Sequence, residues 1–220
     1  MLRYAEFHKI ENDKISETAF YFDIPHLMIQ AGYQPFKEQA AAHLIQPGPT
    51  PHNGLLYAHT DPEEGKQTMD VINSMISDIG NWQSRLPLEK ELVRTWHNDM
   101  IWWGPAGIGA TCTISRYAQQ HSGPFRAGLS DRSSTGHISR IAEGNFGAFF
   151  GWPNFTAKPT GGYLGLPPSN KDCEFRVIDI YRREGKKLKE NWVFIDLLYF
   201  FQQQGIDILG KLKFLDHNIY

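Results

Sequence analysis

Apolar and polar residues alternate with two different periods along the chain, and the change of period separates predicted helices from predicted strands. Asp61 is followed by a proline and two glutamates, which is a typical start of a helix. Apolar residues then recur at helical spacing and give this segment one apolar face: Met69, Ile72, Ile76 and Ile79. The pattern therefore predicts a long amphipathic helix after a linker rich in proline and glycine.

Two further helices and a set of strands are expected after this helix. A second amphipathic helix is indicated by Leu88, Leu92, Val93 and Trp96. It leads into a short strand over 99–103, and a third helix is predicted over 111–121. The remaining segments read as strands divided by glycine, proline and asparagine, near 136–143, 146–158, 173–183 and 187–196. Helices followed by an antiparallel sheet define an α+β class, and a curved sheet wrapped around helices makes a cone with a pocket at its mouth.

Residues 3–32 and 176–205 repeat one pattern without a gap. Seven of the thirty aligned pairs are identical, among them Arg3/Arg176 and Asp23/Asp196, where composition alone would give about two. Each copy reads as strand, polar turn, strand and a short apolar helix that ends at Gly32 or Gly205. Two unrelated hairpins of similar composition are the alternative.

The repeat suggests a domain organisation for the whole chain. We predict the C-terminal hairpin and helix of an incomplete first repeat over 1–35, a linker over 36–60, a complete domain over 61–210 and a tail over 211–220. A two-stranded hairpin is marginally stable alone, so the first copy should dock on the main domain or on another chain. Its exposed edges favour a homodimer.

Composition and charge narrow the classes of partner. The formal net charge is −2, which gives no electrostatic reason to expect nucleic acid or an acidic membrane surface. The two cysteines are far apart, the N-terminus lacks a secretory signal and no apolar stretch is long enough to cross a bilayer, so we expect a soluble cytoplasmic protein. Metal-ligand spacings, phosphate-binding loops and nucleophile motifs are missing from the sequence, which predicts no metal and no cofactor.

Four segments in order resemble the SnoaL-like polyketide cyclase family, within the cone-shaped group that includes nuclear transport factor and ketosteroid isomerase. They are His97–Pro105, Gly161–Pro168, Asp179–Arg182, and Glu190–Trp192 leading to Gln202–Gly205. The resemblance covers roughly 60–210, and 3–32 looks like the end of a second such domain. It implies a cofactor-free enzyme that abstracts a proton α to a carbonyl of a small apolar substrate, in cyclase or isomerase-type aldol or enolisation chemistry. A non-catalytic ligand-binding or dimerisation domain of the same fold is the alternative.

The resemblance makes Asp179 the first candidate for catalysis. This residue matches the strand position where the isomerase carries a protonated aspartate and the SnoaL cyclase a histidine. Its neighbours in sequence are apolar or aromatic, and an inward-facing carboxyl among them should have a raised pKa. The alternative is an aspartate at the rim that pairs with Arg176 or Arg182.

The next strand departs from the family pattern. The cyclase's catalytic aspartate falls at Val193 in this sequence. Asn191 stands where many relatives have histidine, and it can donate a hydrogen bond but cannot act as a base. Asp196 lies at the junction between strand and helix and is interpreted as a helix N-cap.

The remaining candidates are a polar pair and a set of rings. His97 and Asp99 lie two apart on a strand and point to the same side, which suits a base with its orienting carboxylate; alternatively, His97 caps the preceding helix. Aromatic and histidine side chains would form a wall for flat apolar ligands, with ordinary core packing as the alternative. The predicted ligand-binding residues are Trp102, His137, Phe149, Tyr181 and Trp192.

Overall fold

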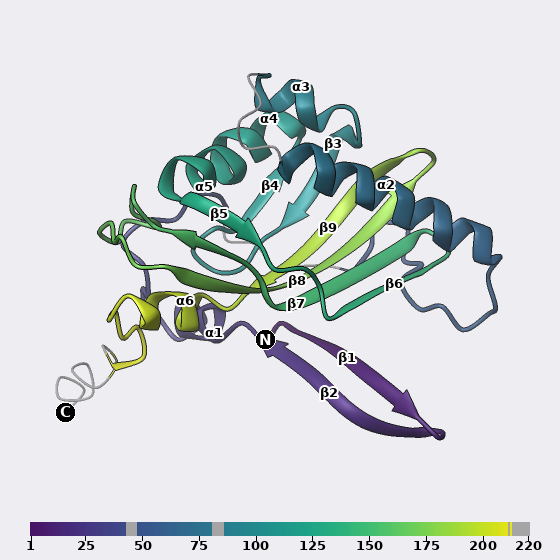
Figure 1. Ribbon diagram of the computed structural model, residues 1–220, viewed down its shortest axis with the longest axis horizontal. Helices are drawn as coiled ribbons and strands as arrows, with labels where there is room; N and C mark the ends of the chain where they lie inside the picture. The colour runs from purple at the N-terminus through teal and green to yellow at the C-terminus, as the bar shows by residue number, and fades with distance from the viewer. Residues whose placement is uncertain (43–47, 81–85, 211, 213–220) are drawn as a thin grey trace.

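The computed structural model describes residues 1–42, 48–80, 86–210 and 212 (Figure 1). Part of the predicted linker, 43–47, and the predicted tail apart from Leu212 lie outside the described residues. In the described part, no helix is both long and apolar enough to cross a membrane.

The long predicted helix is α2, Pro62–Gly80. Its start is defined by Asp61, whose Oδ1 accepts a hydrogen bond from the backbone amide of Glu63 at 3.0 Å. Ile72 and Met75 are buried on the face toward the sheet. The helical periodicity of the sequence is therefore confirmed here.

The second predicted helix is shorter than expected. Helix α3 covers only Leu88–Leu92, and Trp96 belongs to strand β3, Trp96–Trp103. The apolar spacing over 88–96 arose because α3 and the first residue of β3 both face the core, where Leu92 and Trp96 are buried. Periodicity alone does not separate a helix from a turn that leads into a strand.

The third helical segment begins later and extends further than predicted. Residues Ala110–Cys112 form strand β4, which pairs with β3. The helical run comprises α4, Ile114–Tyr117, a π-helical turn over Ala118–Ser122, and α5, Gly123–Gly128. The π-helical turn precedes Pro124, which has no amide N–H for a regular helical hydrogen bond.

A seven-stranded sheet forms the other layer. Its order is β4-β3-β9-β8-β7-β5, with β6 also pairing with β7. The strands are β5 Ser130–Ser134, β6 Ser139–Glu143, β7 Phe146–Lys158, β8 Cys173–Glu184 and β9 Lys187–Ile195. Strand β5 was not predicted, because its sequence SDRSS lacks apolar alternation.

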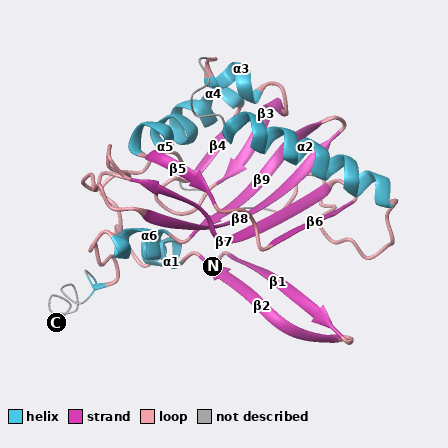
Figure 2. Ribbon diagram, in the orientation of Figure 1, coloured by secondary structure: helices cyan, strands magenta, loops and turns pink. Residues whose placement is uncertain are grey.

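The two layers form the expected cone. Helix α2 and the helical run over 114–128 lie across one face of the curved sheet, whereas hairpin β1–β2 lies on the opposite side (Figure 1). Helix α1, Ile24–Gln30, follows β2, and helix α6, Leu197–Gln203, follows β9 (Figure 2). The α+β cone predicted from the sequence is confirmed.

The N-terminal hairpin makes the same internal contacts as hairpin β8–β9. Strands β1, Tyr4–Glu11, and β2, Lys14–Phe22, lead into α1. The amide of Asp23 donates to the carbonyl of Arg3 at 3.1 Å, and the amide of Asp196 donates to that of Arg176 at 3.0 Å. Each aspartate also accepts from the amide three residues later, which confirms the predicted cap at Asp196.

Both copies also end in the same way. Gly32 and Gly205 have φ angles of 88° and 84°, the left-handed conformation that glycine adopts at a helix C-terminus. The two segments thus share their turns, their helix N-caps and the glycine that ends each helix. The assignment of 3–32 to an incomplete first domain stays a prediction.

The N-terminal hairpin docks on the outer face of the main sheet. Ala5 and Tyr21 pack against Phe150, Ile178 and Phe194 in one buried cluster. This packing gives the hairpin the apolar partner that an isolated two-stranded sheet lacks.

A buried polar contact supports the same docking. The Arg3 guanidinium lies 3.0 Å from Asp23 Oδ2 and donates to the carbonyl oxygens of Gly104 and Val193 at 2.7 and 3.1 Å. The amide of Ala106 donates to Asp23 Oδ2 at 2.9 Å. The ion pair therefore has partners on both sides of the interface, as a buried pair requires.

Replacing Arg3 by alanine should lower the free energy of unfolding by about 3 kcal/mol, because it leaves the Asp23 carboxylate buried without its counter-ion. Urea denaturation at pH 7 measures this loss. Lys9→Ala removes ion pairs from the exposed end of the same hairpin and should leave the urea midpoint unchanged. Equal midpoints for the two variants would contradict the role of Arg3.

Candidate functional site

A cavity of about 150 Å³ lies between the concave face of the sheet and the helical layer. Its apolar wall includes Met75 of α2, Trp102 of β3, and Phe149 and Phe155 of β7. Polar groups enter it from β8, β9 and the helical run over 114–128. An apolar cavity with a few convergent polar groups is the usual form of a small-molecule site.

Strand register brings the central residues together. Asp179 of β8 is paired with Phe149 of β7 and Val193 of β9, and Tyr181 is paired with Asn191. Paired residues in a sheet point to the same face, so all five side chains line the cavity. The structure thus brings Asp179, Asn191, Phe149 and Tyr181 to one cavity, and their roles in catalysis and ligand binding stay a prediction.

The Asp179 carboxyl is held by two hydrogen bonds on one oxygen. The Tyr181 hydroxyl donates to Oδ1 at 3.1 Å, and Asn191 Nδ2 donates to the same oxygen at 3.3 Å. Asn191 also donates to the Ile180 carbonyl at 3.0 Å, which fixes its amide. The other oxygen, Oδ2, accepts no hydrogen bond from the described residues and is left for a ligand.

Burial determines the proton affinity of this carboxyl. Desolvation raises the pKa of Asp179 to about 6, although the hydrogen bonds from Asn191 and Tyr181 act in the opposite direction. The alternative interpretation, an aspartate at the rim paired with an arginine, is wrong. Arg176 instead pairs with Asp196, and Arg182 with Glu184 and Glu190.

Two cavity residues that the sequence analysis missed come from the helical run. The His121 ring stacks on Trp102 with centroids 4.0 Å apart, and burial lowers its pKa to about 3, so the imidazole is neutral. Its Nδ1 is buried and has no hydrogen-bond partner among the described residues. Burial also raises the pKa of Tyr117, whose hydroxyl is therefore protonated. Their separation by four residues in a predicted helix was the signal that could have found them.

Two other predicted residues also line the cavity. Trp102 is the ring on which His121 stacks, and the His137 ring lies 4.0 Å from that of Phe149. Burial and the nearby charge of Arg140 lower the pKa of His137 to about 4. Both lie in the cavity wall, and their role in ligand binding stays a prediction.

His97, Asp99 and Trp192 do not line the cavity, which corrects their predicted placement. His97 and Asp99 do share one side of β3, but it is the outer side, because Trp96, Met100 and Trp102 are the inward residues. Trp192 packs outside the cone with Trp103 and Ala110, because its neighbours Asn191 and Val193 face inward.

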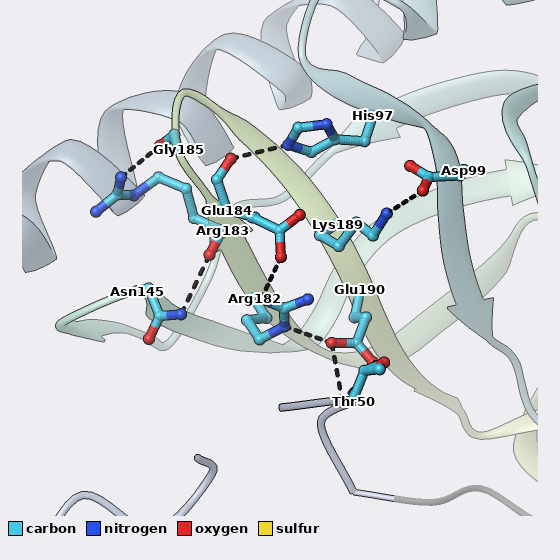
Figure 3. A network of polar contacts seen from close by, with 10 residues as sticks. All are labelled: Thr50, His97, Asp99, Asn145, Arg182, Arg183, Glu184, Gly185, Lys189 and Glu190. Carbon is cyan, nitrogen blue, oxygen red and sulfur yellow. Dashed lines mark hydrogen bonds and ion pairs between the residues drawn. The ribbon is translucent and has the colours of Figure 1, made fainter. Parts of the chain in front are cut away.

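A structural polar network lies on the outer side of hairpin β8–β9 and the neighbouring strand β3 (Figure 3). His97 Nε2 lies 2.8 Å from the Glu184 carbonyl oxygen, and Asp99 pairs with Lys189. Further along the same hairpin, the buried Glu190 binds Arg182 and accepts from the Thr50 hydroxyl at 2.7 Å. These contacts hold the hairpin and the linker in place, and they orient no group toward Asp179.

Within the described ranges, no three His, Cys, Asp or Glu side chains come together in a way that could hold a metal ion. The polar groups of the cavity are instead suited to proton transfer and hydrogen bonding. One carboxyl with a raised pKa shares an apolar cavity with a neutral imidazole and phenolic hydroxyls.

The fold and this site define a cone-shaped α+β domain with a pocket at the concave face of its sheet. The family model of the SnoaL-like polyketide cyclases matches residues 136–204, the segment that contributes Asp179, Tyr181 and Asn191 to the cavity. The resemblance to this family that the sequence indicated is therefore confirmed over residues 136–204. The match does not include 3–32. A search of the curated proteins finds no relative that matches.

Solved structures show the same architecture at low sequence identity. A protein assigned as a SnoaL-like polyketide cyclase from Jannaschia sp. CCS1 is 14% identical, with a TM-score of 0.56 over 66% of this chain and 96% of that chain. IdmH of Streptomyces antibioticus, assigned as a polyketide cyclase, is 16% identical, with a TM-score of 0.50 over 64% and 99%. An NTF2-like protein of Burkholderia xenovorans LB400 is 13% identical, with a TM-score of 0.50 over 63% and 96%. At these identities the likeness shows the fold alone.

Asp179→Asn should stabilise the protein at neutral pH but not in acid. The carboxyl pKa is about 6 in the folded protein and near 3.8 when unfolded, so the native state binds more protons between these values and loses stability as the pH rises. The asparagine variant avoids this loss. From pH 4 to pH 7 its free energy of unfolding should gain on that of wild type by roughly 2–3 kcal/mol.

Urea denaturation at both pH values measures this gain. Asp172→Asn is the matched control, because the Asp172 side chain is 78% exposed. A constant difference between Asp179→Asn and wild type across this pH range would show that the buried carboxyl is not destabilised.

Proposed function

We propose that this protein is a cofactor-free enzyme that removes a proton from the carbon next to a carbonyl group of a small apolar substrate, with Asp179 as the base. The observation that carries the proposal is the geometry of this carboxyl. One oxygen is held by Tyr181 and Asn191, and the other is available in an apolar cavity. A base with a pKa of about 6 is largely ionised at neutral pH and still has useful proton affinity.

The first step transfers the substrate's α proton to Asp179 Oδ2. The electrons of the C–H bond move onto the carbonyl oxygen and form an enolate. Asn191 and Tyr181 orient the carboxyl for this transfer but supply no proton acceptor of their own. The roles given from sequence to Asp179 and Asn191 are kept in this proposal, whereas His97 and Asp99 have no part in it.

The enolate oxygen needs hydrogen-bond donors, and Tyr117 and His121 have this role in the proposal. Both line the same cavity, and both are uncharged at neutral pH because burial opposes their ionisation. Return of the proton to another position gives isomerisation or exchange. Attack of the enolate carbon on a second carbonyl carbon of the substrate forms a carbon–carbon bond, and Asp179 then returns its proton to the new alkoxide.

The family match supports this class of reaction. The SnoaL-like model is named for polyketide cyclases, and IdmH is assigned to the same activity. Cyclisation of a polyketide by aldol chemistry begins with the proton abstraction described above. The substrate class proposed here, a small carbonyl compound, follows from this chemistry and from the modest cavity volume.

A second candidate, a ligand-binding domain without turnover, is favoured by Val193. This residue stands opposite Asp179 at the position where the resemblance places the cyclase's catalytic aspartate. Its side chain lines the cavity, so β9 contributes no carboxylate there. Proton transfer then depends on Asp179 alone.

Solvent deuterium should enter the α position of at least one compound in a panel of β-keto esters and cyclic ketones. NMR measures the exchange for wild type, Asp179→Asn and Asp172→Asn. Exchange should be lost in the first variant, which keeps the shape of the side chain but removes the base, and unchanged in the second. Tight binding of a panel compound without exchange would favour the ligand-binding alternative.

Tyr117→Phe should lower the exchange rate constant of bound substrate by about 10²-fold, the usual effect of removing one oxyanion donor. The substitution keeps the ring that packs against Trp102. Single-turnover exchange at saturating substrate separates this effect from binding. An unchanged rate constant would exclude the Tyr117 hydroxyl as a donor to the enolate.

A further inference from the structure

The cavity wall contains a hydrogen-bond donor that the proposed proton transfer does not use. Trp96 of β3 lines the cavity and is only 2% exposed. Its indole Nε1 is buried and has no hydrogen-bond partner among the described residues. A buried indole N–H normally has a partner in a folded protein, so an unpaired one in a cavity wall indicates a contact that a ligand completes.

The aromatic neighbours of Trp96 leave this N–H without an acceptor. The Trp96 ring lies next to the rings of Tyr117 and Tyr181, with centroids 6.4 and 5.9 Å away. The Tyr181 hydroxyl donates instead to Asp179 Oδ1 at 3.1 Å. Because an indole N–H can only donate, the group that completes the contact must be an acceptor.

Strand register separates this donor from the base. Trp96 is paired with Leu188 of β9, and Leu188 is paired with Arg183 of β8. Arg183 lies four residues beyond Asp179, which is roughly 13 Å along the strand. Tyr181, which the Trp96 ring approaches, lies between these two levels. The indole N–H and the Asp179 carboxyl therefore contact different atoms of one ligand.

The chemistry of the donor defines the acceptor. An indole N–H has no formal charge, so it cannot offset the cost of removing an anion from water. A carbonyl oxygen costs far less to bury and is a good acceptor for an N–H group. An uncharged carbonyl oxygen is thus the group that suits this end of the cavity.

We infer that the substrate carries a second carbonyl group, whose oxygen binds Trp96 Nε1 while the reacting carbonyl group lies beside Asp179. The position of the reacting group rests on the proposed function, whereas the contact with Trp96 does not. A buried donor discriminates against a ligand without an acceptor, because the donor then stays unsatisfied. Trp96 therefore determines which carbonyl compounds the cavity selects.

Two symmetric ligands test this inference. Cyclohexane-1,4-dione has a carbonyl group at each end, and 1,4-dimethylidenecyclohexane has nearly the same shape with C=CH2 in place of each C=O. Because each ligand is symmetric, its orientation in the cavity does not affect the comparison. NMR titration at pH 7.5 follows the indole N–H signals, and Trp96→Phe assigns the Trp96 signal by its loss. The dione should move this signal downfield, whereas the hydrocarbon should not.

The dissociation constants of the two ligands measure the effect of the N–H group. Its removal should weaken binding of the dione about tenfold relative to binding of the hydrocarbon. Comparing this ratio between wild type and variant cancels the different hydration of the ligands. Replacement of Trp96 by 3-benzothienylalanine keeps the two-ring shape and puts sulfur in place of the N–H. Trp103→Phe is the control and should leave the ratio unchanged, because Trp103 lies on the same strand but packs outside the cone.

Three results would overturn the assignment of Trp96. The first is a Trp96 signal that does not move when the dione is bound. The second is the same ratio of dissociation constants in wild type and in the benzothienylalanine variant. The third is a wild-type protein that binds neither ligand.

Deuterium exchange into the same dione keeps the two hypotheses separate. Exchange at its ring carbons without a change in the Trp96 signal would support the proton abstraction and overturn the assignment of Trp96. A downfield Trp96 signal without exchange would contradict the proton abstraction and leave the assignment standing. Asp179→Asn should keep the Trp96 shift, because this variant lacks the base but retains the indole.

Discussion

The register of β8 between β7 and β9 is the constraint on which the site depends. Antiparallel pairing sends alternate residues to opposite faces, so Asp179 and Tyr181 enter the cavity together with Asn191. The same alternation sends Arg182 and Glu190 to the outer face, where they form a buried ion pair. A slip of one residue would exchange the two sets and place a salt bridge in the cavity. The outer polar network therefore supports the site by holding this register.

The cavity carries a cost in stability that the rest of the fold must offset. A carboxyl with a raised pKa is destabilised in its ionised form, and a buried imidazole is held neutral. Stacked rings in and around the cavity wall supply compensating packing, for example Phe155 on Phe175 with centroids 4.5 Å apart. The groups that lose solvation are the groups with useful chemistry, because the same apolar surroundings that raise the pKa of Asp179 would strengthen hydrogen bonds to an enolate.

Comparison of the N-terminal hairpin with hairpin β8–β9 shows that the helical layer closes the cavity over one face of the sheet. Val177, Val193 and Ile195 line the cavity under the helical layer, whereas the residues aligned with them in the N-terminal hairpin, Tyr4, Phe20 and Phe22, are 59%, 43% and 46% exposed. Both hairpins bury their other face, against each other. Two hairpins with similar turns and caps thus lie in different environments, because α2 and the segment 114–128 cover β8–β9 and not β1–β2.

The sequence by itself determined the local elements and the first site residue. The start of α2 at Asp61, the caps at Asp23 and Asp196 and the strand that carries Asp179 all follow from short-range patterns, since turns, caps and periodicity are local properties. Only the tertiary structure decided which sides of these elements meet. It placed His97 and Asp99 outside because the parallel pairing of β3 with β9 turns Trp102 inward, and it brought His121 to the cavity from a helix distant in sequence. The packing between elements decides which side of a strand or helix points into the cavity, and a local sequence pattern does not contain that information.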